Sequence, residues 1–229
     1  MIRDTECSSR NEPSRNIKAV AMMGGTFDPI HIGHLRSAIE LREMLSLDNV
    51  HLVVNRVPPH RQVPGVTPED RLAMVQAAVA SLDGIIVDDQ EIRRSGPSYS
   101  VLTLASLRRE YGPEARLVMA VGIDAFVHLA EWYEAERIFE LAHVVVIERP
   151  GADLTWTPEL VSLIAHREVE DITTLMQQPH GSLAFVSLPC PVEISATELR
   201  KRINRQLSIR FLVPAGVEEI ISERHLYRE

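Results

Sequence analysis

Two histidines three residues apart, His31 and His34, lie in a segment of small residues that follows an apolar run at 17–23. The segment reads Gly-Gly-Thr-Phe-Asp-Pro-Ile-His-Ile-Gly-His over residues 24–34. Glycine lets a backbone approach a ligand closely, and the N-terminus of a following helix offers unpaired N–H groups and about half a positive charge. Side chains three apart on a helix lie on nearly the same face, so both imidazoles could reach one phosphate chain. The pattern predicts a phosphate site, whereas a Gly-Gly pair alone would indicate only a tight turn.

A second motif lies near the other end of the chain, where Ser195 and Glu198 form a Ser-x-x-Glu pattern. In such a capping box each side chain accepts from the backbone N–H of the other residue, which predicts a helix that begins at Ser195. Taken alone, this is a common structural device. Together with the first motif, it offers a second positive helix end and Arg200 to the phosphates held by His31 and His34.

Both motifs need a scaffold that brings them to one edge of the molecule. Strand-like apolar runs recur at 17–23, 50–54, 84–87, 116–121, 143–147 and 183–188. Helices are predicted at 33–45, after the cap Thr67-Pro68, at 99–110 and around 158–168. This alternation predicts an α/β fold, a doubly wound, mainly parallel Rossmann-like sheet with helices on both faces and a small C-terminal helical part. Because open α/β sheets bind ligands at the carboxyl ends of their strands, we expect residues 24–34 at the switch point there.

Composition limits the classes of protein to which the chain can belong. The chain has 229 residues, a net charge of -8 and 45% hydrophobic residues, which is enough for a substantial core. We expect a disordered tail at 1–16 and a single domain at 17–229, with an insertion at 151–181. The acidic balance argues against a general nucleic-acid surface, and the polar start and the lack of a long apolar run argue against a membrane protein. A cytoplasmic protein is therefore expected, and its oligomeric state stays open.

On these motifs the chain resembles the bacterial nicotinate-nucleotide adenylyltransferases, nucleotidylyltransferases that share a His-x-Gly-His motif and a downstream Ile-Ser-x-Thr-x-x-Arg motif. The resemblance runs from about Lys18 to the C-terminus. Its blocks follow in order: residues 24–35, Pro58-Pro59-His60-Arg61, Ser95-Gly96-Pro97-Ser98-Tyr99-Ser100, Gly122-Ile123-Asp124 with Trp132, and Ile194-Ser195-Ala196-Thr197 with Arg200. Ser100, where the family more often has Thr, and Leu102, where Asp is frequent, depart from the pattern.

The resemblance implies transfer of AMP from ATP to nicotinate mononucleotide, which gives deamido-NAD and pyrophosphate, with Mg²⁺ held mainly through substrate phosphates rather than by protein ligands. It implies that these residues surround ATP: Gly24, Gly25, Thr26, Phe27, His31, His34, Gly122, Asp124, Ser195, Thr197 and Arg200. It implies that these surround the pyridine nucleotide: His60, Arg61, Tyr99, Ser100 and Trp132.

The attacking group of such a reaction is already a phosphate anion, so charge and alignment decide the rate and no protein nucleophile is needed. We assign His34 to the α-phosphate, His31 to the α and β oxygens, and Arg200 to the departing pyrophosphate. These three are the expected catalytic residues.

Several alternatives remain at this point. The letters His-Ile-Gly-His also occur in class I aminoacyl-tRNA synthetases, but no Lys-Met-Ser-Lys-Ser follows here. A sister adenylyltransferase acting on nicotinamide mononucleotide or pantetheine phosphate, a cytidylyltransferase and a non-catalytic nucleotide sensor stay open. A metal-binding module using His31, His34 and His60 is disfavoured, because the spacing is poor for zinc and no cysteine accompanies it. Trp132 could equally be a core residue.

Overall fold

The computed structural model describes residues 17–56, 65–149 and 155–228. Its centre is one sheet of six parallel strands in the order β3-β2-β1-β4-β5-β6. The strands are β1 (Ala19–Gly25), β2 (Asn49–Val54), β3 (Ile85–Asp88), β4 (Arg116–Gly122), β5 (His143–Ile147) and β6 (Leu183–Val186). This order is that of a doubly wound Rossmann-like fold, so the predicted fold class is confirmed.

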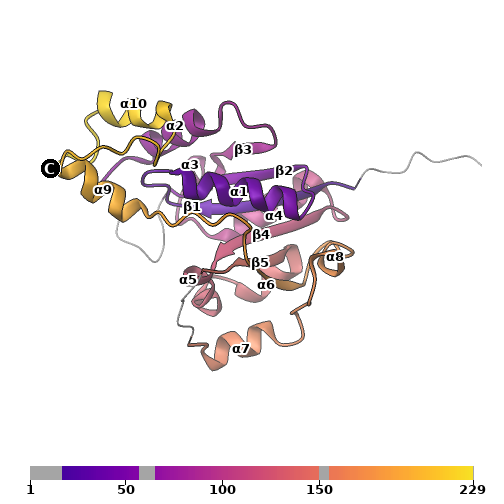
Figure 1. Ribbon diagram of the computed structural model, residues 1–229. Helices are drawn as coiled ribbons and strands as arrows, with labels where there is room; N and C mark the ends of the chain where they lie inside the picture. The colour runs from indigo at the N-terminus through magenta and orange to yellow at the C-terminus, as the bar shows by residue number, and fades with distance from the viewer. Residues whose placement is uncertain (1–16, 57–64, 150–154, 229) are drawn as a thin grey trace, which may run out of the picture.

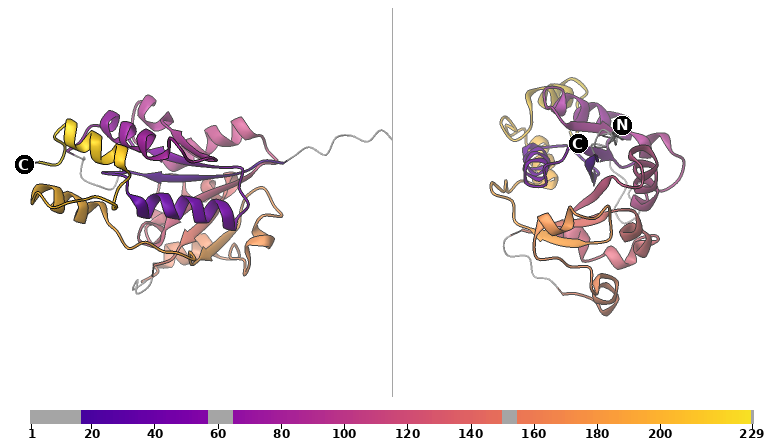
Figure 2. Two further views of the ribbon diagram at one scale, coloured as in Figure 1. Left: turned by 45° about the horizontal axis from the view of Figure 1, so that its top comes forward. Right: turned by 90° about the vertical axis from the view of Figure 1, so that its right-hand side faces the viewer.

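The helices cover the sheet on both sides (Figures 1 and 2). They are α1 (Ile32–Met44), α2 (Pro68–Val79), α3 (Gln90–Arg93), α4 (Ser100–Tyr111), α5 (Ile123–Phe126), the 3-10 turn η1 (Leu129–Glu131), α6 (Ala135–Leu141), α7 (Pro158–Ile164), α8 (Ile172–Leu175), α9 (Ala196–Asn204) and α10 (Ala215–Glu223). The expected tail at 1–16 lies outside the described residues, and so does the start of the expected insertion at 151–181, whose described part carries α7 and α8.

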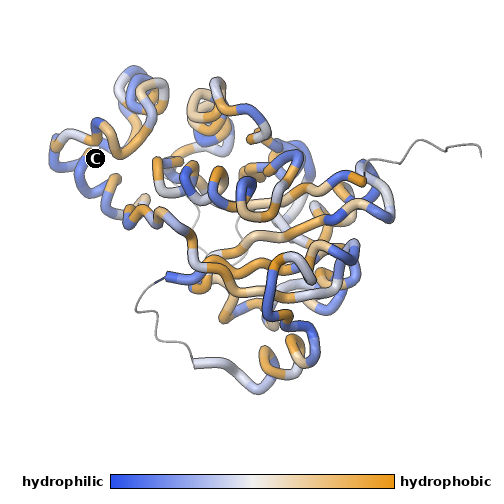
Figure 3. The backbone as a smooth tube through the Cα atoms, turned by 45° about the vertical axis from the view of Figure 1, so that its right-hand side comes forward, coloured by the Kyte–Doolittle hydropathy of each residue, from blue (hydrophilic) through white to orange (hydrophobic). Residues whose placement is uncertain are grey.

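Alternate residues of the central strands pack into two separate cores. In β1, Ala19 and Ala21 face the core formed with α1, α2, α9 and α10, while Val20 and Met22 face the core formed with α4, α6 and α7. Successive side chains of a strand point to opposite faces, so a sheet covered on both sides needs apolar residues at every position. Figure 3 shows the resulting orange strands surrounded by bluer loops and outer helix faces.

Local signals fixed several helix ends. The Thr67 hydroxyl accepts from the Asp70 backbone N–H at 3.1 Å and Pro68 opens α2. Helix α4 stops at Gly112, whose φ of +90° suits glycine. The helix expected around 158–168 was too long: α7 ends at Ile164, because Glu168 instead pairs with Leu183 in a parallel bridge.

The strand order reverses between β1 and β4, which pair directly. Each of these strands ends in a glycine, Gly25 and Gly122, and a helix follows each of them. The carboxyl end of β1 and the start of α1 lie at the left of Figure 1, where α9 and α10 also lie. The motif at 24–34 therefore occupies the switch point, as predicted.

His143, the first residue of β5, forms hydrogen bonds with the segment that precedes β6. The buried ring accepts from the Ser182 backbone N–H through Nδ1 at 3.1 Å and contacts the Gln178 carbonyl through Nε2 at 2.8 Å. These two contacts require a neutral ring with its proton on Nε2. Burial, chiefly, lowers the pKa of His143 to about 4.

This pKa predicts an acid-sensitive stability. Between pH 6.5 and 4 the unfolded chain takes up a proton at this histidine and the folded chain does not, so the free energy of unfolding should fall as the pH falls. At pH 5 the loss from His143 should be about 2 kcal/mol, at 1.36 kcal/mol for each pKa unit. Urea unfolding of wild type and His143→Gln at pH 7 and pH 5 measures it. The variant should lose less stability between the two pH values than wild type. The control is His166→Gln, because His166 is exposed. Equal losses in His143→Gln and wild type would contradict the prediction.

Candidate active site

The two histidines of the motif lie against each other at the start of α1. His31 is the residue before the helix, and its ring stacks on that of His34 with a centroid distance of 3.6 Å and an interplanar angle of 23°. The His31 backbone N–H donates to His34 Nδ1 at 3.3 Å, and Phe27 packs edge-on against His34 at 5.1 Å. The expectation that both imidazoles share one face is confirmed.

His31 is buried, with 4% of its surface exposed. Burial, and secondarily the nearby charge of Arg149, lower the pKa of His31 to about 4. At neutral pH the ring is therefore neutral, and it can serve a phosphate as a hydrogen-bonding group. An anion placed against it would favour the protonated ring and raise this pKa.

At two glycines of the motif, a side chain would crowd neighbouring atoms. A Cβ on Gly25 would lie 2.8 Å from the Phe27 ring, and a Cβ on Gly33 would lie 3.1 Å from both His31 Nδ1 and the Val192 carbonyl oxygen. The glycine between the histidines thus lets the segment before α9 pass close to the start of α1. Gly24 and Thr26 lie in the same turn.

Arg200 reaches this turn from α9. Its Nη1 donates to the Asp28 carbonyl oxygen at 2.7 Å and lies 3.7 Å from Asp28 Oδ2, and its Nη2 donates to Thr197 Oγ1 at 3.3 Å. The Ser195 hydroxyl accepts from the Glu198 backbone N–H at 3.2 Å, as the capping pattern predicts. The two motifs, far apart in the sequence, therefore meet at one turn. Which of these groups touch ATP remains a prediction.

Asp28 also accepts a hydrogen bond from Tyr227, near the C-terminus. Sequence reasoning missed this residue. The Tyr227 hydroxyl donates to Asp28 Oδ1 at 2.7 Å. Burial, followed by the Asp28 charge, raises the pKa of Tyr227 well above its ordinary value, so the hydroxyl keeps its proton. The turn is thus held by both Arg200 and the C-terminal segment.

Two further charged residues follow the neighbouring strands. Asp124 follows β4, and Arg149 follows β5. Arg149 Nη1 lies 3.1 Å from Asp124 Oδ2, and both side chains are largely exposed. Arg149 was missed by sequence reasoning, although its place directly after a strand at the carboxyl edge is a usable signal.

Two of the residues expected around the pyridine nucleotide, Tyr99 and Ser100, lie at the start of α4. Tyr99 precedes this helix, Ser100 opens it, and the Tyr99 ring stacks on that of Tyr133 at 4.5 Å. The neighbouring Trp132 packs partly on the second core and also lines a hollow of about 610 Å³ beside α7. This hollow includes neither Tyr99 nor Ser100, so stacking of Trp132 on the pyridine ring remains a prediction. Tyr133 was not among the predicted site residues, and the structure places it against Tyr99.

His60 and Arg61 lie outside the described residues, so their expected roles remain predictions. Leu102, the departure from the family pattern, is partly exposed on α4.

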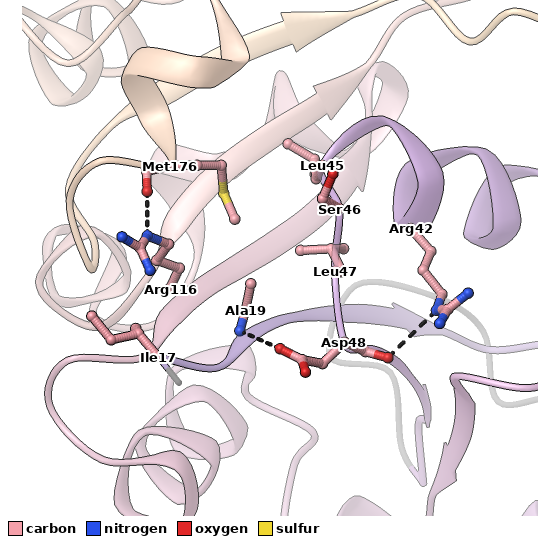
Figure 4. A pocket seen from close by; sticks show the side chains of 9 residues that line it. All are labelled: Ile17, Ala19, Arg42, Leu45, Ser46, Leu47, Asp48, Arg116 and Met176. Carbon is pink, nitrogen blue, oxygen red and sulfur yellow. Dashed lines mark hydrogen bonds between the residues drawn. The ribbon is translucent and has the colours of Figure 1, made fainter. Parts of the chain in front are cut away.

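A second hollow, of about 540 Å³, lies at the opposite edge of the sheet (Figure 4). Ala19 and Arg116, which line it, begin β1 and β4. Figure 4 shows that its polar groups already bond to one another: Asp48 accepts from the Ala19 N–H and Arg42, and Arg116 donates to the Met176 carbonyl. It is separate from the turn that carries the histidines.

Within the described ranges, no group of three His, Cys, Asp or Glu side chains is placed to hold a metal ion. No helix in the same ranges is long and apolar enough to cross a membrane.

The doubly wound sheet and the turn joined to Arg200 at its switch point define an α/β nucleotidyltransferase. A family model described as cytidylyltransferase-like matches residues 22–202. A Chromohalobacter salexigens protein named probable nicotinate-nucleotide adenylyltransferase is 56% identical over 96% of this chain and 99% of its own length. A Pseudomonas aeruginosa protein of the same name is 43% identical, over 92% and 98%. The chain belongs to the cytidylyltransferase-like family and, within it, to the nicotinate-nucleotide adenylyltransferases.

Solved structures agree on the fold. The nicotinic acid mononucleotide adenylyltransferase of Plasmodium falciparum, complexed with NaAD, superposes with a TM-score of 0.68 at 17% identity, over 92% of this chain and 97% of that one. The same enzyme complexed with APC gives a TM-score of 0.66. At this identity the likeness concerns the fold alone.

Proposed function

We propose that this enzyme transfers AMP from ATP to nicotinate mononucleotide, with deamido-NAD and pyrophosphate as products. One observation carries the proposal: the stacked pair His31 and His34 and the guanidinium of Arg200 meet at a single turn at the switch point. The names of the relatives, which cover nearly the whole chain, support the choice of substrates.

The proposed reaction is a direct in-line displacement. A phosphate oxygen of the mononucleotide attacks the α-phosphorus of ATP, a new P–O–P bond forms, and the bond to the β-phosphate oxygen breaks with its electron pair leaving on pyrophosphate. No proton need be removed from the attacking anion. His34 stabilises the α-phosphate oxygens, His31 the α and β oxygens, and Arg200 the departing pyrophosphate.

We propose Mg²⁺ as the cofactor. Mg²⁺ usually keeps several waters and binds through substrate phosphates, so the ion would be held mainly by the phosphate oxygens of ATP. When bound, the ion neutralises charge on the triphosphate. Of the expected site residues, none is assigned as its direct ligand.

The start of α4 favours a substrate whose pyridine ring carries a carboxylate. This helix has 12 residues, and Tyr99, the residue before it, makes no side-chain cap to its first turn in the described structure. A helix N-terminus favours a negative group, so a carboxylate placed there is preferred to a carboxamide of the same shape. This favours nicotinate over nicotinamide mononucleotide.

A substrate comparison tests the proposal. ATP is offered with nicotinate mononucleotide, nicotinamide mononucleotide or pantetheine phosphate in turn, and pyrophosphate release gives kcat/KM for each. The proposal expects the highest value with nicotinate mononucleotide. A higher value with either rival would replace the substrate, and ATP binding without pyrophosphate release from any of them would indicate a sensor.

Trp132→Ala separates the two readings of that residue. If Trp132 stacks on the pyridine ring, KM for nicotinate mononucleotide should rise much more than KM for ATP, since only one substrate loses a contact. The control is Trp156→Ala, because Trp156 stacks on Phe185 at 5.6 Å and the two rings pack against the core of α4, α6 and α7. It should not raise KM for the mononucleotide selectively. Equal increases in both KM values would assign Trp132 to the core alone.

A further inference from the structure

Arg71 of α2 is 0% exposed and is the largest fully buried side chain that the structure describes. Its Nη1 donates to the Thr26 carbonyl oxygen at 2.5 Å. Its Nη2 donates to the carbonyl oxygens of Asn55 at 2.7 Å and Arg56 at 3.3 Å. One rigid guanidinium thus bonds to two separate segments of backbone.

Both segments lead to residues that are predicted to bind the substrates. Thr26 lies in the turn between β1 and α1, while Asn55 and Arg56 leave the end of β2 and lead in the sequence towards His60 and Arg61. The Asn55 N–H already donates to the Gly25 carbonyl at 3.1 Å, so the two segments run together past the end of the sheet. Beyond this backbone bond between Asn55 and Gly25, Arg71 links the two segments through its side chain.

The bonds that the structure describes for Arg71 go to backbone carbonyls and not to a carboxylate. Within the described ranges no carboxylate forms an ion pair with Arg71, and its Nε has no hydrogen-bond partner. Burial lowers the pKa of this arginine, with Asp28 opposing the effect from a distance. Replacing Arg71 by an apolar residue would leave the carbonyl oxygens of Thr26, Asn55 and Arg56 without this donor, so some loss of stability should accompany any effect on the reaction.

We propose that Arg71 is a positioning residue for adenylyl transfer: it fixes the turn that holds ATP relative to the segment that leads to the second nucleotide. This inference rests on the proposed assignment of the two nucleotide sites. It predicts an effect on the alignment of two bound substrates, and therefore on kcat, rather than on either substrate's binding alone.

The chain contains a matched control. Arg108 of α4 also donates to carbonyls of separate segments, through Nε to Leu141 at 3.0 Å, through Nη1 to Ala115 at 2.6 Å and through Nη2 to Pro179 at 2.9 Å. These segments lead into β5, β4 and β6. Arg108 therefore also links separate backbone segments, but at the opposite edge of the sheet from the histidine turn.

The experiment compares Arg71→Met, Arg71→Lys and Arg108→Met with wild type by steady-state kinetics in both substrates, at a temperature well below each variant's Tm. Arg71→Met should lower kcat by about 10- to 100-fold, because small misplacements of aligned reactants have effects of that size. Both KM values should change much less. Arg71→Lys keeps a charge but cannot bond to both segments at once, so kcat should fall there too. Arg108→Met should lower Tm and leave kcat near the wild-type value.

Three outcomes would overturn the proposal. These are Arg71 variants with the kcat of wild type, an Arg108→Met variant with the same loss of kcat, and failure of both Arg71 variants to fold, which would assign Arg71 to the fold alone. Each result is the kcat of a variant divided by the kcat of wild type, measured with the acceptor nucleotide that wild type uses. An incorrect choice of acceptor nucleotide would therefore leave these ratios unchanged and be recognised separately.

Discussion

His34→Ala should lower kcat by about 10²- to 10³-fold, the effect of removing one donor that stabilises transition-state charge. The ring of His34 is fixed by its stacking on His31 and by the His31 N–H that donates to its Nδ1. A fixed donor needs no reorganisation when charge develops on the α-phosphate, so its loss should fall on kcat more than on KM. Pyrophosphate release at saturating concentrations of both substrates measures it.

The control for this variant is His180→Ala, since His180 is exposed and lies in the loop between α8 and β6. It should keep the wild-type kcat. Circular dichroism and Tm distinguish a local loss from a disturbed start of α1. A folded His34→Ala enzyme with the kcat of wild type would remove His34 from the proposed mechanism.

Arg200→Met should lower kcat/KM for ATP by on the order of 10²-fold, because the cation expected at the departing pyrophosphate is lost. The same change removes the donor to the Asp28 carbonyl, while the Tyr227 hydroxyl still donates to Asp28 Oδ1. We therefore also expect a modest fall in Tm. Initial rates at varied ATP concentration, with the mononucleotide saturating, give the kinetic effect.

Arg205→Met is the matched control for Arg200. Arg205 is exposed at the C-terminal end of the same helix, α9, away from the end that approaches Asp28. This variant should have nearly wild-type kinetics although it loses the same charge. Equal losses in the two variants would mean that net positive charge on α9, rather than the placement of Arg200, supports the reaction.

The parts that sequence predicted are those with local signals. Continuous apolar runs and helical spacing predicted the six strands, the helices α1 and α4, and the starts of α2 and α9 within a few residues. Burial on both faces of the sheet demands such apolar runs. The caps at Thr67 and Ser195 were readable because each bonds only three residues along the chain. The short helix α6 was missed, since seven residues give too few turns for a clear period.

The missed site residues share a different cause. Arg71, Tyr227 and Arg149 reach the site from α2, the C-terminal segment and the end of β5, and each contact spans tens of residues or more. No local pattern encodes such a contact, because it depends on how whole elements pack. The convergence of Arg200 with the histidine turn was predictable because the two motifs were interpreted together as one phosphate site.

The most direct test of the account is a crystal structure of the full chain with a non-hydrolysable ATP analogue. We expect α-phosphate oxygens within about 3 Å of a ring nitrogen of His34, and β or γ oxygens within the same distance of Arg200. A triphosphate bound elsewhere, for instance against Arg42 and Arg116 at the opposite edge of the sheet, would contradict it.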